Sequence, residues 1–305
     1  MRFANLDGRA VLSTPEGYAD VAAASGGRFG PDPSEALNQW PALTDWAAEQ
    51  DLSVLRSYVA GSGSNGQRHD AVPVGPPVPH PRQVFGIGLN YRDHVAESGF
   101  TVPTAPAVFT KFPSCLAGAH DSVTLPPGSV DWEVELVVVI GRRCDWVSED
   151  AAWSHVAGVT VGQDLSEREM QRAGPAPQFS LAKSFRGFAP LGPELVTVDE
   201  LPDPDDLALG CELESGQSLQ SGRTSDLVFS VPELIARLSA VCPLLPGDLI
   251  FTGTPAGVGA GRTPPQFLRP GDVLVSWIEG VGSMRNTMVE SPAVASQRAS
   301  AHTTR

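Results

Sequence analysis

Two glutamates separated by one residue lie inside an apolar, β-branched run, VDWEVELVVVIG, at residues 130–141. Because strand side chains alternate between two faces, Glu133 and Glu135 would point the same way, about 7 Å apart. Two like charges on one buried face are costly unless a cation neutralises them. Asp164 ends the next strand-like run, VAGVTVGQD, and supplies a third carboxylate. Oxygen ligands without thiolates suit a hard divalent cation, so the three residues form a predicted metal site.

The alternation of this run also permits a second interpretation. Asp131, Glu133 and Glu135 could face water from a strand that is buried on its other face only. The two interpretations differ in the burial of the glutamates.

A histidine and a glutamate three residues apart follow the predicted strand Val84–Leu89. On a short helix, His94 and Glu97 would share one face and could form a hydrogen bond. A carboxylate that holds an imidazole in one tautomer makes a general base that works near neutral pH. The alternative is a surface ion pair on a mobile helix.

Polar residues also follow Asp164, in the segment LSEREMQ. If this segment is a helix, Arg168 and Gln171 stack on Asp164 and could hold a substrate carboxylate or ketone oxygen. A solvated helix face with the charges Glu167 and Glu169 would give the same pattern.

Further along, the sequence contains one more candidate site residue, a lysine, and it lacks several known binding and catalytic motifs. Lys183 stands alone in an apolar, small-residue run, as either a rim charge or an anion-binding group. The Gly-rich loop 253–259 lacks the Gly-Lys-Ser/Thr of a phosphate loop, and Gly86-x-Gly88 lacks the third glycine of a dinucleotide site. There is no G-x-S-x-G elbow, which argues against acyl-enzyme chemistry.

The composition argues against several classes of partner and location. The chain has 35 acidic and 21 basic residues, a net charge of −14, and no basic cluster, which argues against a nucleic-acid or anionic-membrane partner. No apolar run approaches the ~20 residues of a membrane span, and the first residues do not have the apolar centre of a signal peptide. The four cysteines are widely spaced and suggest buried thiols of a cytoplasmic protein.

The elements that must position these groups are mostly short strands. Asp7-Gly8 suggests a hairpin turn, residues 34–51 have a broken helical pattern, and 231–241 is a clear amphipathic helix. Strand-like alternation occurs at 207–218 and 226–230, at 249–252, and in two final segments before residue 290. We predict an α+β fold, mainly β, with a small N-terminal domain and linker (1–78), a catalytic domain (79–290) and a polar tail (291–305).

Over about residues 79–290 the sequence resembles the fumarylacetoacetate hydrolase family. The motifs that carry the resemblance occur in the family's order: GIGLNYRDHVAESG, FTKFPS, VDWEVELVVVIG, VAGVTVGQDLSEREMQ, KSFRGFAPLGP, LLPGDLIFTGTPAGVG and FLRPGDVL. The resemblance implies a β-sandwich roll with a small N-terminal α/β domain, usually in a homodimer with Mg²⁺, Mn²⁺ or Ca²⁺; we expect Mg²⁺. Gln163 stands where asparagine is more usual, and Glu194 where many relatives have tryptophan.

The resemblance also implies roles for individual residues. These are metal ligands at Glu133, Glu135 and Asp164, a water-activating dyad of His94 and Glu97, polar groups around the substrate at Arg168, Gln171 and Lys183, and a substrate-contacting Thr254.

The expected activity is metal-dependent hydrolysis of a C–C bond in a 2,4-dioxo acid such as an acylpyruvate, through an enolate whose charge Lys183 offsets. Two alternatives use the same site: isomerisation of a 2-hydroxyhepta-2,4-diene-1,7-dioate, or decarboxylation of oxaloacetate. A protein that only binds a small acid is a further alternative.

Overall fold

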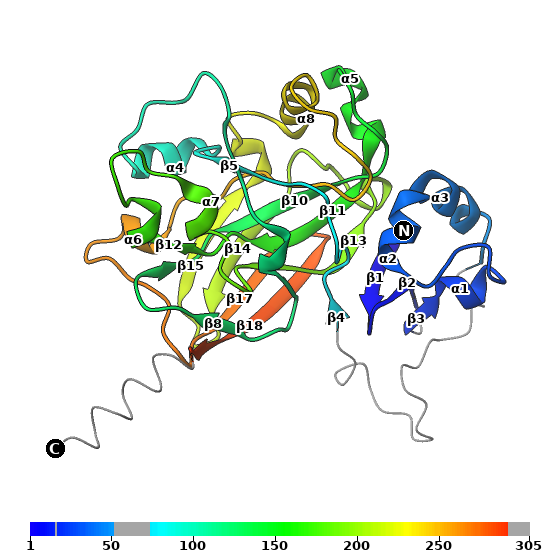
Figure 1. Ribbon diagram of the computed structural model, residues 1–305, viewed down its shortest axis with the longest axis horizontal. Helices are drawn as coiled ribbons and strands as arrows, with labels where there is room; N and C mark the ends of the chain where they lie inside the picture. Colours follow the sequence, from blue (N-terminus) through cyan, green and yellow to red (C-terminus); the bar gives the residue numbers. More distant parts are fainter. Residues whose placement is uncertain (16, 52–73, 292–305) are drawn as a thin grey trace.

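The computed structural model describes residues 1–15, 17–51 and 74–291 of the chain (Figure 1). The fold class is the predicted one: mixed α and β, with strands predominating. The Gly/Ser-rich loop 61–70 and the polar tail after Ser291 lie outside the described residues. Within these residues, no helix has the length and apolar character needed to cross a membrane.

One large sheet forms the centre of the molecule. Its strand order is β3-β2-β1-β13-β11-β10-β16-β5-β6, with β4 paired to β1 and β7 paired to β13. The strands are β1 (Arg2–Leu6), β2 (Arg9–Thr14), β3 (Gly17–Asp20), β4 (Val74–Gly75), β5 (Val84–Gly88), β6 (Ala107–Thr110), β7 (Leu116–Gly118), β10 (Val134–Ile140), β11 (Val156–Gln163), β13 (Ala189–Val196) and β16 (Leu249–Phe251).

A second sheet, in the order β15-β14-β17-β18-β8, packs against the first. Strands β10, β11 and β13 of the large sheet contact β14, β17 and β18 of the smaller one. A separate pair, β12-β9, lies beside them. The strands are β8 (Val123–Leu125), β9 (Val130–Asp131), β12 (Ser166–Glu167), β14 (Ala208–Leu213), β15 (Ser218–Arg223), β17 (Val273–Ile278) and β18 (Gly282–Glu290).

The helices are short and lie around the sheets (Figure 1). Helix α8 has the predicted apolar face, and the Ser230 hydroxyl accepts a hydrogen bond from the Glu233 N–H at its start. The α-helices are α1 (Val21–Ala24), α2 (Pro33–Asn38), α3 (Trp40–Ala48), α4 (Arg92–Glu97), α5 (Glu149–Ala152), α6 (Arg168–Gln171), α7 (Phe179–Ala182) and α8 (Val231–Ser239). The 3₁₀ turns are η2 (Pro113–Cys115), η3 (Trp153–His155), η4 (Val198–Glu200), η5 (Thr224–Asp226) and η6 (Gly259–Gly261).

The N-terminal hairpin turns where the sequence predicted. Asp7 and Gly8 both have positive φ, 52° and 78°, as a two-residue hairpin turn requires. Strand β1 then pairs antiparallel with β13, so the large sheet continues across the predicted domain boundary near residue 78. Figure 1 shows this first segment in blue beside β13. The division into two domains stays a prediction.

The apolar run at 130–141 is two strands and not one. Strand β9 pairs with β12, whereas β10 pairs with β11 and β16, so the chain changes partners between residues 131 and 134. At the break, the Glu133 N–H binds the Gln163 side-chain oxygen, and the Glu133 carbonyl accepts the Asp164 N–H. The break therefore fixes Glu133 beside the end of β11.

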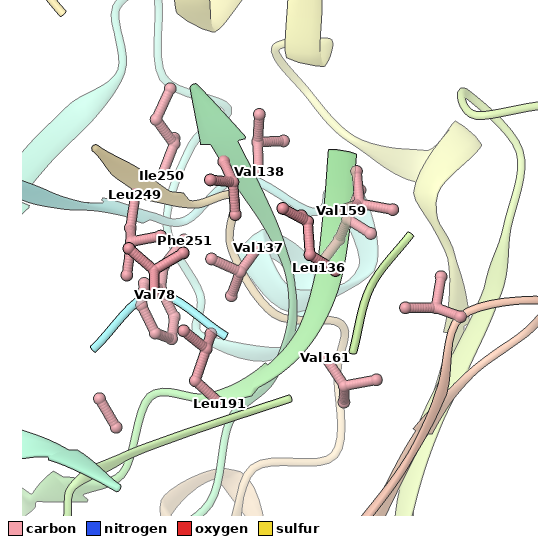
Figure 2. Close-up of a cluster of buried hydrophobic side chains, with 14 of the residues drawn as sticks. Val78, Leu136, Val137, Val138, Val159, Val161, Leu191, Leu249, Ile250 and Phe251 are labelled. Carbon is pink, nitrogen blue, oxygen red and sulfur yellow. The ribbon is translucent and has the colours of Figure 1, made fainter. Parts of the chain in front are cut away.

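Every residue of β10 is buried, which explains its continuous apolar pattern. Figure 2 shows Leu136, Val137 and Val138 of this strand among the side chains of Val159 and Val161 (β11), Leu191 (β13), Leu249, Ile250 and Phe251 (β16), and Val78, which lies between β4 and β5. This packing gives the carboxylates at the end of β10 a rigid base.

One predicted strand, 226–230, is wrong. Residues 226–230 form no strand: Leu227 makes only an isolated antiparallel bridge with Tyr91, and the Val228 and Phe229 amides donate to the backbone and side-chain oxygens of Asn90. The strand that continues β14 is β15, at Ser218–Arg223, after a turn.

We predict that Val138→Ala lowers the free energy of unfolding by about 2 kcal/mol, because it removes buried methyl groups and leaves a cavity. Val138 is 0% exposed and Val241 is 86% exposed, so Val241→Ala is a matched control. Urea titration of both variants measures the difference, and equal losses would contradict the packing described here.

Candidate metal centre and its surroundings

Three carboxylates meet where β10 begins and β11 ends. Glu133 lies at the break before β10, Glu135 on β10, and Asp164 directly after β11; one oxygen of each lies within 4.8 Å of the others. All three are buried, and Glu135 is only 1% exposed. The interpretation that Asp131, Glu133 and Glu135 face water is therefore wrong. Three converging, buried carboxylate groups fit a hard divalent cation.

Lys183, the residue that follows α7, points into this cluster. Its Nζ donates to Glu133 Oε2 at 2.8 Å, to Asp164 Oδ2 at 2.6 Å and to the Ser166 hydroxyl at 2.8 Å. Burial alone would lower the pKa of Lys183, but the two carboxylates outweigh it and raise that pKa. The side chain is buried, so Lys183 is not a rim charge.

A second buried lysine, Lys111, was not predicted as a site residue. It follows β6, and its Nζ donates to Asp164 Oδ1 at 2.6 Å, to the Phe188 carbonyl at 3.2 Å and to the Lys183 carbonyl. Its only signal in the sequence is one charge within the motif FTKFPS. Both oxygens of Asp164 therefore have an ammonium partner.

Arg168 and Gln171 reach the site differently from the prediction. Residues 166–167 form β12, and α6 spans only Arg168–Gln171, so the stripe that began at Asp164 is wrong. The Asp164 N–H is used by the Glu133 carbonyl, and the Glu167 side chain caps α6. Arg168 NH1 lies 2.7 Å from Glu133 Oε1 and donates to Gln171 Oε1 at 3.0 Å, and both residues are buried. The solvated helix face is therefore also wrong.

His94 and Glu97 lie on α4, as the spacing indicated. His94 Nδ1 is 3.3 Å from Glu97 Oε2, and the Gly257 N–H donates to both oxygens of Glu97 at 3.0 and 3.2 Å. Burial would raise the pKa of Glu97, but hydrogen bonds from His94 and Gly257 outweigh it and lower the pKa. His94 is buried, so the two residues are not a surface ion pair.

The loop after β16 supplies backbone donors to three acidic side chains. The Gly253 N–H donates to Glu135 at 2.8 Å, that of Gly257 to Glu97, and that of Gly259 to Asp131 at 2.7 Å. Gly257 has φ +106°, and a Cβ there would lie 2.3 Å from a backbone oxygen, so a glycine is required. The loop therefore works through its peptide groups.

Thr254 of the same loop and Gln220 of β15 support β10. The Thr254 hydroxyl donates to the Val134 carbonyl at 2.9 Å and accepts from Gln220 Nε2 at 2.8 Å. The substrate contact of Thr254 stays a prediction.

The pKa values of the two glutamates shift in opposite directions because their neighbours differ. Burial would raise the pKa of Glu133, but Lys183 and Arg168 outweigh it and lower that pKa to about 2. Burial raises the pKa of Glu135 well above its usual range, and the charges of Asp164 and Glu133 add to the effect. The raised pKa favours the protonated form of Glu135, and a bound cation would oppose this effect.

We predict that Mg²⁺ or Mn²⁺ binding releases a proton and strengthens as the pH rises, because Glu135 must ionise to coordinate the ion. Calorimetry in buffers of different ionisation enthalpy measures the number of protons released, which we expect to be about one. Glu135→Gln should bind the ion far more weakly and release no proton. Proton release that Glu135→Gln leaves unchanged would contradict this assignment.

Three comparisons with known proteins agree on the relatives of this chain. A family model described as "Fumarylacetoacetate (FAA) hydrolase C-terminal" matches residues 83–289. A Bos taurus protein named "Oxaloacetate tautomerase FAHD2A, mitochondrial" is 45% identical over 215 residues, which cover 70% of this chain and 68% of that protein.

Solved structures extend the likeness to the N-terminal segment. A Mycobacterium smegmatis protein provisionally described as HpcE is 55% identical, with a TM-score of 0.88 over 95% of this chain and 100% of that one. Maleylpyruvate hydrolase from Sphingobium sp. SYK-6, solved with manganese(II) and pyruvate, is 28% identical, with a TM-score of 0.74 over 95% and 100% of the two chains.

Proposed function

This chain belongs to the fumarylacetoacetate hydrolase family, and we propose that it is a metal-dependent enzyme that hydrolyses a C–C bond in a 2,4-dioxo acid. One observation carries the proposal: two buried lysines bind the buried carboxylate triad, and the loop after β16 holds both Glu135 of the triad and Glu97 of the His94–Glu97 dyad through its backbone N–H groups. Related proteins named as a hydrolase and as a tautomerase act on small oxo acids, which suits the same substrate class.

Glu133, Glu135 and Asp164 would hold the divalent ion, with Mg²⁺ as our proposal. When bound, such an ion supplies Lewis acidity that polarises a 2-oxo acid and stabilises enolate charge. Manganese in the maleylpyruvate hydrolase structure supports a divalent ion of this type.

Cationic and amide groups beside the triad would bind the substrate. Arg168 and Gln171 are joined by a hydrogen bond and present donors for a substrate carboxylate or ketone oxygen. Lys183 would offset negative charge as the C–C bond breaks, because its ammonium is kept protonated by its carboxylate partners.

The dyad would activate water. Glu97 binds His94 Nδ1, which leaves Nε2 to accept a proton from a water molecule. That water attacks the distal carbonyl carbon, the C–C bond breaks, and its electron pair becomes the enolate of the departing 2-oxo acid. The proton held on His94 then returns to the enolate carbon, so atoms and charge balance.

Oxaloacetate tautomerisation is a second candidate, favoured by the 45% identity to the bovine protein of that name. In this reaction His94 would move a proton between carbon and oxygen of the substrate, with no attack by water.

We predict that His94→Ala lowers kcat by about 10²–10⁴-fold and leaves Mn²⁺ affinity unchanged, because general-base assistance has this magnitude and His94 is not in the triad. Steady-state kinetics and Mn²⁺ titration measure the two effects. His80, which is exposed, provides the control variant His80→Ala. Unchanged turnover in His94→Ala would remove the dyad from the mechanism.

The products formed from a panel of substrates distinguish the candidate activities. We expect the protein with Mg²⁺ to consume the enol absorbance of an acylpyruvate and release two acids. Oxaloacetate and a 2-hydroxyhepta-2,4-diene-1,7-dioate complete the panel. A single isomer would establish tautomerase or isomerase activity instead, and CO₂ with pyruvate would establish decarboxylation. Tight binding of these acids without turnover would indicate a binding protein.

A further inference from the structure

Asp131 is the fourth buried carboxylate of this region, and protein donors occupy both of its oxygens. Oδ1 accepts the N–H groups of Gly259 at 2.7 Å and Trp132 at 2.9 Å. Oδ2 accepts the Ala260 N–H at 2.9 Å and Arg168 Nε at 2.8 Å. The residue is 0% exposed and is outside the cluster of three carboxylates that could hold a metal.

These contacts link Asp131 to two parts of the site. Through Arg168, Asp131 is linked to Glu133 of the triad, because Arg168 NH1 lies 2.7 Å from Glu133 Oε1. Through Gly259 and Ala260, it is linked to the segment 257–261.

The segment 257–261 also contacts Glu97. The Gly257 N–H donates to the Glu97 carboxylate, and a Cβ at Gly261 would lie 2.8 Å from Glu97 Cδ. The segment therefore touches Asp131 on one side and the dyad on the other.

We propose that Asp131 is a positioning residue that fixes the segment 257–261, and through Gly257 the Glu97 carboxylate, against the Arg168–Glu133 pair. A carboxylate is needed because all four partners donate. An asparagine has one acceptor oxygen, and its NH₂ group would oppose either two backbone N–H groups or Ala260 and Arg168. The inference rests on the proposed function only in assigning proton transfer to the dyad.

Asp131→Asn tests the proposal, and Asp248→Asn is a matched control. Asp248 is also 0% exposed and accepts N–H groups of Gln83 and Leu245, but it lies just before β16, at the end of that strand remote from Gly253. Both variants replace a fully buried, multiply bonded carboxylate by an amide.

The first measurement needs no substrate. We expect hydrogen exchange of the Gly257 and Gly259 amides to become about tenfold faster or more in Asp131→Asn, because their local opening costs less, and to stay unchanged in Asp248→Asn. The Mn²⁺ dissociation constant should change by less than about 3-fold, because the triad is intact. Unchanged exchange, or loss of Mn²⁺ binding, would overturn the proposal even if the protein has no activity on the proposed substrates.

The second measurement separates positioning from general destabilisation. We expect Asp131→Asn to lower kcat about 10–100-fold with KM within about 3-fold, and to lower kcat less than about 3-fold in a Glu97→Gln background, because residues that act as a unit are not additive. If the decreases in kcat of the two single variants multiply in the double variant, Asp131 has only a structural role.

If Asp131→Asn does not fold, Ala260→Pro removes one amide donor and keeps the charge of Asp131. Residue 260 lies in a 3₁₀ turn, whose φ a proline can adopt. We expect about 3–10-fold faster exchange at Gly257 in this variant; unchanged exchange would contradict the proposal.

Discussion

Charge compensation among buried side chains is the condition on which this site depends. Four carboxylates, Asp131, Glu133, Glu135 and Asp164, are buried together, and three buried cations, Lys111, Arg168 and Lys183, face them. An unpaired charge at this depth would cost several kcal/mol, so each buried charge needs a partner of opposite sign. The cations come from the residue after β6, from α6 and from the residue after α7, so segments on both sides of β10 and β11 contribute. The site therefore exists only when the whole sheet arrangement has formed.

The peptide groups of one loop complete this compensation. Amides at residues 253, 257, 259 and 260 donate to Glu135, Glu97 and Asp131. Unlike a side-chain amide, a peptide N–H has almost no freedom to reorient once the backbone is fixed. Glycines at 253 and 257, both with φ near +105°, allow the turns that aim these groups. Glu135 of the triad and Glu97 of the dyad are thus supported by a single backbone segment.

The parts of the site that depend on neighbouring strands or on spacing within one helix could be predicted from the sequence. The meeting of Glu133, Glu135 and Asp164 followed from two adjacent apolar runs, and the contact of His94 with Glu97 from a spacing of three. Lys111 could not be found this way, because its partners lie 53 or more positions away in the chain. The stripe from Asp164 to Gln171 failed because the Glu133 carbonyl takes the Asp164 N–H. Asp131 owes its environment to backbone amides, which carry no residue-type signal. The homodimer and the cytoplasmic location stay predictions.

The double attachment of Asp164 has a consequence for ion exchange. With Lys111 on one oxygen and Lys183 on the other, an arriving ion must share this ligand with ammonium groups that repel it. Such competition lowers the affinity for the ion without distorting the arrangement of its ligands, so we expect a bound ion to exchange readily. Which ion is resident would then reflect cellular abundance more than intrinsic preference. The same lysines would hold the Asp164 carboxylate in place when no ion is bound.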